Sequence, residues 1–170
     1  MQITVIEGDI TIQRVEAIVN AANSSLLGGG GVDGAIHRAA GPQLLEHCRR
    51  LRRTDWPQGL PAGEAALTPA ADLPADYVVH TVGPNRRAGQ TDPQVLQSCF
   101  RRSLEVAAGA GARTLAFPAI GAGVYGWDPR EVAESAHRAF GDASALVGTF
   151  SEIRFVLFSP ELSEIFRQRF

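Results

Sequence analysis

The sequence predicts one domain, residues 1–170, with a three-layer α/β/α architecture and a central mixed, largely parallel sheet. Strand-like segments alternate with helical ones along the chain, and neither a repeat nor a change of composition marks a second domain. The segment Tyr77–Val82 is apolar or β-branched almost throughout, as expected for a strand that helices cover on both faces. Two glycine clusters follow strand-like segments, and ligands bind at such strand ends in open α/β sheets.

The first part of the chain is expected to form two short strands before its first helical segment. Apolar residues dominate both strands, at 2–6 and 17–20. Residues 35–53 place apolar side chains at helical spacing, but a Gly-Pro pair at 41–42 interrupts them, so two helical pieces are predicted. Residues 54–63 are rich in proline, glycine and polar side chains, which indicates a loop.

The rest of the chain repeats one design of helix start, in which a polar side chain precedes proline. The side-chain oxygen caps free N–H groups, and proline suits the first helical position. These starts are Asp92-Pro93, Asp128-Pro129 and Ser159-Pro160, and Glu131 is expected to complete a capping box with Asp128. The predicted helices and strands of this part are helices 93–109, 129–140 and 160–169 and strands 64–68, 77–82, 114–118 and 153–158.

The basic residues exclude several chemistries, because all 16 are arginine and the chain has no lysine. A P-loop, a Schiff base and a Ser/Lys nucleophile pair all need a lysine amine. The net charge of −2 provides no overall field that would gather nucleic acid. The arginines within 49–53 and at 86–87 are expected to lie on a solvated helix end and a loop.

The two cysteines, Cys48 and Cys99, are too few for a disulfide framework and have no zinc-ligand spacing, which favours a reducing compartment. The N-terminus reads directly as a strand, without the charged region or cleavage site of a targeting segment. The longest mainly apolar stretch, 115–124, is broken by proline and glycine and is shorter than the ~20 residues of a membrane span. We therefore expect a cytoplasmic protein with no membrane association.

The glycine cluster at 121–126 matches the pattern G-x-G-x-x-G of dinucleotide-binding folds. In that fingerprint the third glycine lies inside the helix, whereas here the helix is predicted to begin only at Pro129. The acidic residue expected ~20 positions later, at the end of the next strand, is also missing, because Ser159 stands there. The sequence therefore favours another kind of phosphate loop, in which glycine lets backbone N–H groups turn toward an anion.

The other glycine cluster is more specific. It lies in the segment 19–41, which combines a strand-end amide, four consecutive glycines at 28–31 and an acid, Asp33, that opens a helix. Four consecutive glycines are costly in backbone entropy unless a ligand must approach closely. This segment resembles the signature of the MacroD-type macrodomains, which bind ADP-ribose and often hydrolyse it from acceptors. Further segments that resemble macrodomain motifs, in the family's order, are 8–11, 63–65, 77–84 and 118–126.

The resemblance implies how this chain would bind ADP-ribose. Asp9 would accept hydrogen bonds from the adenine amine, with Ile10 beside it. Phe158 would pack against the adenine, although a core position suits it equally. Asn20 and Asn23 would orient the distal ribose, although Asn20 is as compatible with tying the loop together. The residues implied to hold the diphosphate through backbone N–H groups are Gly31, Val32, Gly121, Gly123, Val124, Tyr125 and Gly126.

The resemblance also implies that Asp33 and Asn23 are catalytic. In MacroD-like hydrolases the matching aspartate contacts the distal ribose and helps to activate or place the water that attacks an ester, and either this carboxylate or a substrate phosphate takes the proton. A simple helix N-cap is the structural alternative for Asp33. The four histidines, at 37, 47, 80 and 137, are interpreted as structural, with His37 shaping the pocket, and neither a metal site nor another cofactor is expected.

The leading hypothesis is a hydrolase that removes mono-ADP-ribose from acidic side chains of proteins and deacetylates O-acetyl-ADP-ribose. The alternatives are a module that binds ADP-ribose without turnover and a dinucleotide-dependent oxidoreductase. The expected partners are ADP-ribose, ADP-ribosylated proteins and O-acetyl-ADP-ribose, and ADP-ribosylated nucleic-acid ends present the same distal group. We expect a monomer. Since the chain has no lysine, a macrodomain mechanism with a catalytic lysine is excluded, which leaves attack by water.

Overall fold

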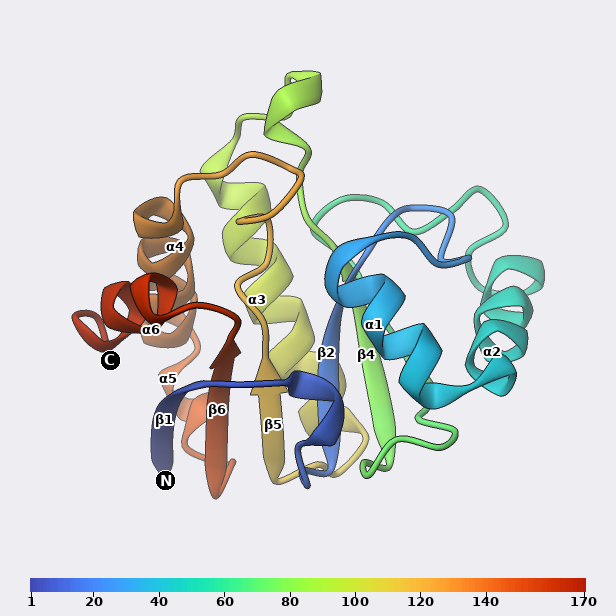
Figure 1. Ribbon diagram of the computed structural model, residues 1–170, viewed down its shortest axis with the longest axis horizontal. Helices are drawn as coiled ribbons and strands as arrows, with labels where there is room; N and C mark the ends of the chain where they lie inside the picture. The colour runs from blue at the N-terminus through green and yellow to red at the C-terminus, as the bar shows by residue number, and fades with distance from the viewer.

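A computed structural model describes residues 1–170, and a six-stranded sheet runs through its centre (Figure 1). The strand order is β1-β6-β5-β2-β4-β3, and every neighbouring pair is parallel except the antiparallel pair β3 and β4. This arrangement confirms the predicted mixed, largely parallel sheet. The strands are β1 (Gln2–Glu7), β2 (Ala17–Ala22), β3 (Ala65–Pro69), β4 (Tyr77–Val82), β5 (Thr114–Phe117) and β6 (Glu152–Leu157).

Helices cover both faces of the sheet and give the predicted three layers (Figure 1). In β5, Leu115 and Phe117 pack into the core beneath α3, α4 and α6, whereas Ala116, between them, packs into the core beneath α1 and α2. This alternation follows from the two-residue period of a strand. The helices are η1 (Ile10–Ile12), α1 (Gly31–Ala40), α2 (Pro42–Arg53), η2 (Arg86–Ala88), α3 (Pro93–Gly109), α4 (Pro129–Asp142), α5 (Ser144–Val147) and α6 (Pro160–Arg167).

The three predicted helix starts are confirmed. Asp92, Asp128 and Ser159 each cap a helix whose first residue is proline, and each side chain accepts a backbone N–H of the first turn. The predicted capping box of α4 is wrong. Glu131 does not return to the cap, because its carboxylate instead faces Arg86 of η2, with an Nη1 to Oε2 distance of 3.5 Å.

Helix α1 begins four residues earlier than the periodicity predicts. Its N-cap is Gly30, so Asp33 lies inside the first turn and is not the cap residue. The helix can start within the glycine run because the loop packs closely against it: a Cβ on Gly34 would lie 2.6 Å from the carbonyl oxygen of Gly29. Apolar periodicity could not reveal this turn, since glycine carries no side chain.

The carboxyl ends of β1, β2, β5 and β6 lie at one edge of the sheet, because these strands are parallel. The segments that follow them therefore meet there: 8–9, 23–30, 118–128 and 158–159. Both glycine clusters belong to this group, as predicted. None of the helices combines the length and the apolar character that spanning a membrane demands.

Candidate functional site

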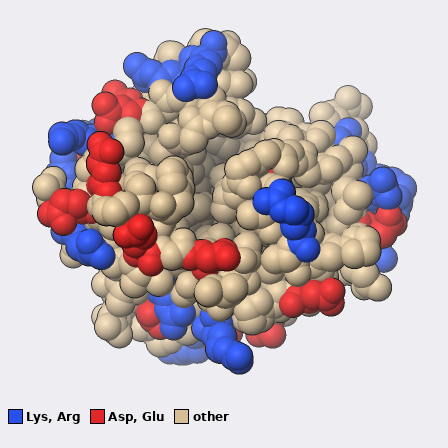
Figure 2. Space-filling view, viewed as in Figure 1, with Lys and Arg blue, Asp and Glu red and all other residues tan.

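A cavity of about 690 Å³ lies at this edge of the sheet, and Figure 2 shows it as a hollow with mainly uncharged walls. Eleven of the thirteen residues predicted to form the site line it. They come from the segment between β1 and η1 with the first residue of η1, the first glycine loop, α1, the second glycine loop and the residue after β6. They are Asp9, Ile10, Asn23, Gly31, Val32, Asp33, Gly121, Gly123, Val124, Tyr125 and Phe158.

The cavity also has lining residues that sequence reasoning missed, nearly all of them small. A residue without a functional side chain carries no chemical signal in a sequence, although several of these lie inside the motifs that were singled out. The missed residues are Gly8, Ala21, Ala22, Gly29, Gly30, Ala35, Gly83, Pro118, Ala119 and Val156.

The second glycine loop presents a row of free N–H groups. The backbone N–H groups of Gly121, Gly123, Val124 and Tyr125 donate to no group of the chain. Such a row is a typical cradle for a phosphate. Gly126 was also predicted to bind here, but the structure does not place it in the cavity wall. Its N–H donates to the carbonyl of Gly123 and closes the turn.

Trp127 fixes the shape of this loop from outside the cavity. Its indole N–H donates to the carbonyl of Pro84, at 2.8 Å, and its backbone N–H donates to the carbonyl of Gly121. Gly121 has φ of 85°, and a Cβ there would lie 3.0 Å from the indole ring. Helix α4 begins only at Pro129, so no glycine of the loop enters the helix, whereas the third glycine of a dinucleotide fingerprint lies inside one.

The N-terminus of α1 also lines the cavity. The N–H groups of Gly31, Val32 and Asp33 have no partner within the chain, as is usual for a first helical turn. The helix dipole adds positive potential at the same place. Together with the second glycine loop, this helix start gives the cavity wall an arrangement of N–H groups suited to an anion, although no basic side chain lines it.

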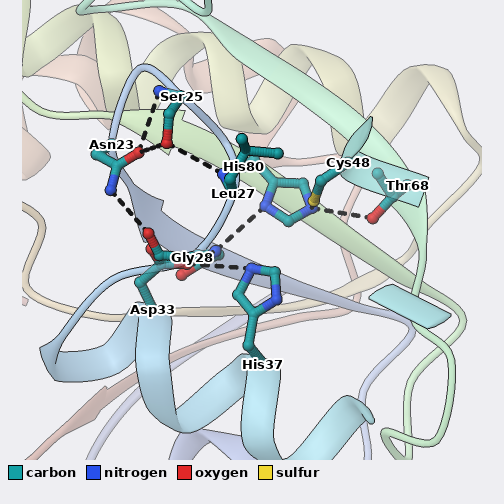
Figure 3. Close-up of polar contacts among 10 residues, drawn as sticks. Asn23, Ser25, Leu27, Gly28, Asp33, His37, Cys48, Thr68 and His80 are labelled. Atoms are coloured by element: carbon teal, nitrogen blue, oxygen red, sulfur yellow. Dashed lines mark hydrogen bonds and ion pairs between the residues drawn. The ribbon is translucent and has the colours of Figure 1, made fainter. Parts of the chain in front are cut away.

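Asp33 is nearly buried, with 4% of its surface exposed, and its two carboxylate oxygens face different groups (Figure 3). Oδ1 accepts a hydrogen bond from Nδ2 of Asn20 at 2.9 Å and lies 3.4 Å from Nε2 of His37. Burial raises the pKa of the Asp33 carboxyl above its ordinary value, while the bond from Asn20 and the charge of His37 act against this rise. A buried carboxylate of raised pKa beside a cavity is typical of a group that handles protons.

Gly29 brings Asp33 and Asn23 to the same point. A Cβ on Gly29 would lie 3.1 Å from Nδ2 of Asn23 and 3.2 Å from Oδ2 of Asp33. Only glycine leaves the space between these two polar groups open, so both can face a ligand on the same side of the cavity.

Asn23 also orders its own loop. Its Nδ2 donates to the carbonyl of Gly28, and its Oδ1 accepts from the N–H and the hydroxyl of Ser25 (Figure 3). Arg52 of α2 also stabilises the loop, because its Nη1 donates to the carbonyl of Ser25 at 2.9 Å. One N–H of the Asn23 amide remains for a ligand.

The structure does not place Asn20 in the cavity, which corrects the predicted contact with a ribose. Asn20 is fully buried in β2, and its amide nitrogen contacts Asp33 and Nδ1 of His80. Nε2 of His80 in turn lies 2.9 Å from the hydroxyl of Thr68. Burial lowers the pKa of His80 to about 3, so its ring is neutral at physiological pH.

Asp9, Ile10 and Phe158 form the other end of the cavity. Oδ1 of Asp9 accepts from the N–H and the hydroxyl of Thr11, which caps η1 and leaves Oδ2 free. Phe158 is 73% exposed and lines the cavity, so it is not a core residue. An exposed aromatic ring beside a free carboxylate oxygen is suited to a flat heterocycle with an amino group.

No group of three or more His, Cys, Asp or Glu side chains lies close enough together to hold a metal ion. The cavity wall presents backbone N–H groups, the amide of Asn23, the carboxylates of Asp9 and Asp33, and the exposed ring of Phe158.

Comparison with known proteins gives one consistent family. The family model described as Macro domain matches residues 19–136. A Macro domain-containing protein of Streptomyces coelicolor is 52% identical over 98% of this chain and 97% of its own length. A protein of Escherichia fergusonii named O-acetyl-ADP-ribose deacetylase is 47% identical over 98% of this chain and 94% of its own length.

Solved structures agree with this result. The Oceanobacillus iheyensis macrodomain with ADP is similar at a TM-score of 0.89, with 39% identity, over 97% of this chain and 87% of that one. The Trypanosoma brucei macrodomain in complex with ADP-ribose has a TM-score of 0.86 and 36% identity, over 98% of this chain and 68% of that one.

Proposed function

This chain belongs to the macrodomain family, and on that premise we propose that it is a hydrolase that cleaves esters of the distal ribose of ADP-ribose. Its substrates are O-acetyl-ADP-ribose and proteins that carry mono-ADP-ribose on acidic side chains. Relatives named O-acetyl-ADP-ribose deacetylase, 47% identical over nearly the whole chain, support the enzyme class. The single observation that carries the proposal is the nearly buried Asp33 carboxylate, which lies beside both the phosphate cradle and Asn23.

In this proposal each part of the site has its own task. In the proposed complex the adenine binds between Asp9 and Phe158, and the diphosphate binds between the second glycine loop and the N-terminus of α1, all of which line the cavity. The distal ribose then reaches Asn23 and Asp33. The raised pKa of Asp33 suits it to accept a proton from water more readily than an ordinary carboxylate does. The bound phosphate is the second group in this region that can take that proton.

The proposal is tested by turnover of the purified protein on three substrates side by side: O-acetyl-ADP-ribose, a glutamate-ADP-ribosylated protein and an oligonucleotide with an ADP-ribosylated phosphate end. Release of ADP-ribose from the first two is expected. Calorimetry with ADP-ribose is run on the same sample. Tight binding without turnover of any substrate would contradict the proposal and establish a binding module instead.

Asp9→Ala is expected to weaken ADP-ribose binding by about 1–3 kcal/mol, as for a lost hydrogen bond to a charged group. Asp9→Asn keeps an oxygen for Thr11 but places an NH₂ group where Oδ2 would accept from the adenine amine, so it should lose a similar amount of affinity while η1 stays capped. Calorimetry measures both variants. An affinity equal to that of the wild type in both variants would show that the adenine does not bind Asp9.

A further inference from the structure

A continuous chain of buried polar contacts runs from β3 to the helix that carries Asp33. It begins at the hydroxyl of Thr68, passes through both ring nitrogens of His80 and the amide of Asn20, and ends at Oδ1 of Asp33. Figure 3 labels Thr68, His80 and Asp33 along this path. The distances along it are 2.9, 3.2 and 2.9 Å. None of the four residues is more than 4% exposed. Thr68, His80 and Asn20 do not line the cavity, so they act on a ligand only through Asp33.

The direction of each hydrogen bond in this chain follows from the chemistry of the groups. An ionised carboxylate only accepts, so Asn20 must turn its NH₂ group, not its oxygen, toward Asp33. The second hydrogen of that NH₂ group points to Nδ1 of His80, which must therefore be the unprotonated nitrogen. The proton of the neutral ring is then on Nε2 and is donated to the hydroxyl of Thr68.

This orientation of the Asn20 amide leaves its oxygen without a hydrogen bond, so other contacts must hold it. Its Oδ1 is buried and has no hydrogen-bond partner. An unpaired buried carbonyl is unfavourable. Turning the amide over would instead point its oxygen at two acceptors, the Asp33 carboxylate and Nδ1 of His80, which is also unfavourable. The acceptor at Nδ1 of His80 and the carboxylate together hold the nitrogen in place.

We propose that His80 is a positioning residue, which holds the Asn20 amide with its N–H toward Asp33 and so keeps that carboxylate ionised and fixed beside the cavity. The inference rests on the proposed catalytic role of Asp33. His80 acts through its tautomer and not through its charge, because it stays neutral far below physiological pH. His80 is therefore not a general base itself. It acts on catalysis only by keeping the Asp33 carboxylate ionised.

Two other titratable side chains lie near these buried contacts, but neither can hold the Asn20 amide in place of His80. His37 of α1 is partly exposed, and its Nε2 lies 3.4 Å from Oδ1 of Asp33, the same oxygen that Asn20 contacts. Cys48 of α2 lies 3.7 Å from Nε2 of His80, and burial raises the pKa of its thiol to about 12, so it is uncharged. Neither side chain contacts the amide of Asn20.

Two variants of His80 test the roles of its two ring nitrogens one at a time. His80→Asn places an amide oxygen near the position of Nδ1, which preserves the acceptor for Asn20. His80→Gln places an amide nitrogen near the position of Nε2, which preserves the partner of Thr68 but removes the acceptor. We expect His80→Gln to lower kcat by about tenfold near pH 6.5, because without the acceptor at Nδ1 the Asn20 amide is free to turn and its charge-assisted hydrogen bond to Asp33 is lost. KM should stay within about threefold, because the phosphate contacts are untouched.

The pH profile distinguishes this role from a purely structural one. Loss of a donor to the ionised form raises the pKa of a carboxylate, so the acid limb of the kcat profile of His80→Gln should move upward by about one pH unit. Activity should recover as the pH rises. His80→Asn should keep the wild-type profile. Equal losses in the two variants, or an unmoved acid limb in His80→Gln, would overturn the inference.

A direct titration keeps the test independent of turnover. The carboxyl pKa of Asp33 is measured by carbon NMR on aspartate-labelled protein, with Asp33→Asn to assign the signal. A raised Asp33 pKa in His80→Gln, with a wild-type pKa in His80→Asn, supports the inference. If the wild type also turned over no substrate, only the proposed function would fail. Should either His80 variant not fold, Thr68→Val removes the partner of Nε2 and should raise the same pKa, while Thr68→Ser should not. An unchanged pKa in Thr68→Val would overturn the inference.

Discussion

Replacing Asp33 by asparagine or alanine is expected to lower the turnover of O-acetyl-ADP-ribose by about 10²–10⁴-fold, the usual range for a lost proton-transfer group. Asparagine preserves the shape of the side chain but cannot accept a proton from water. ADP-ribose affinity should stay within a few-fold, because the diphosphate is held by backbone N–H groups that neither change removes. The measurement is kcat by release of acetate, with calorimetry on the same protein.

The control for this prediction is Asp142→Asn, which removes an exposed carboxylate at the far end of α4. It should leave both kcat and affinity unchanged. If Asp33→Asn lost less than about threefold in kcat, Asp33 would not be the catalytic carboxylate, and the substrate phosphate would be the group that takes the proton.

The parts of this protein that could be predicted from the sequence are those set by neighbours in the chain. The helix starts at Asp92, Asp128 and Ser159 depend on a side chain two or three residues from the N–H that it caps, so a short segment contains the whole signal. The two glycine loops are likewise local, and their lining residues were largely predicted.

The parts that could not be predicted depend on strand register. Asn20 and His80 are sixty residues apart, and they meet because β2 and β4 pair in parallel with these two residues opposite each other. Thr68 joins them through the antiparallel pairing of β3 with β4. A register shift of one residue would send His80 to the other face of the sheet. No local pattern fixes such a register, so His80 has no visible partner in the sequence.

Acid is expected to destabilise the fold through His80. The pKa of this side chain is about 3 in the folded protein, against an ordinary value of 6.5. The unfolded chain therefore takes up a proton below pH 6.5 that the folded protein cannot accept, and stability is lost as the pH falls from 6.5 toward 3. Between pH 6.5 and 4 the loss amounts to two and a half pH units, or about 3 kcal/mol.

Urea unfolding of the wild type and of His80→Asn, at pH 7 and at pH 4, isolates this contribution. Other groups also titrate in this range: Arg154 lowers the pKa of Glu152, which destabilises the fold in acid, and the raised pKa of Asp33 acts in the opposite sense. These groups are present in both proteins, so they cancel in the comparison. The wild type should lose about 3 kcal/mol more than the variant, because asparagine does not titrate. Parallel losses in the two proteins would mean that His80 can be protonated within the fold, and its tautomer could not then hold Asn20 against Asp33.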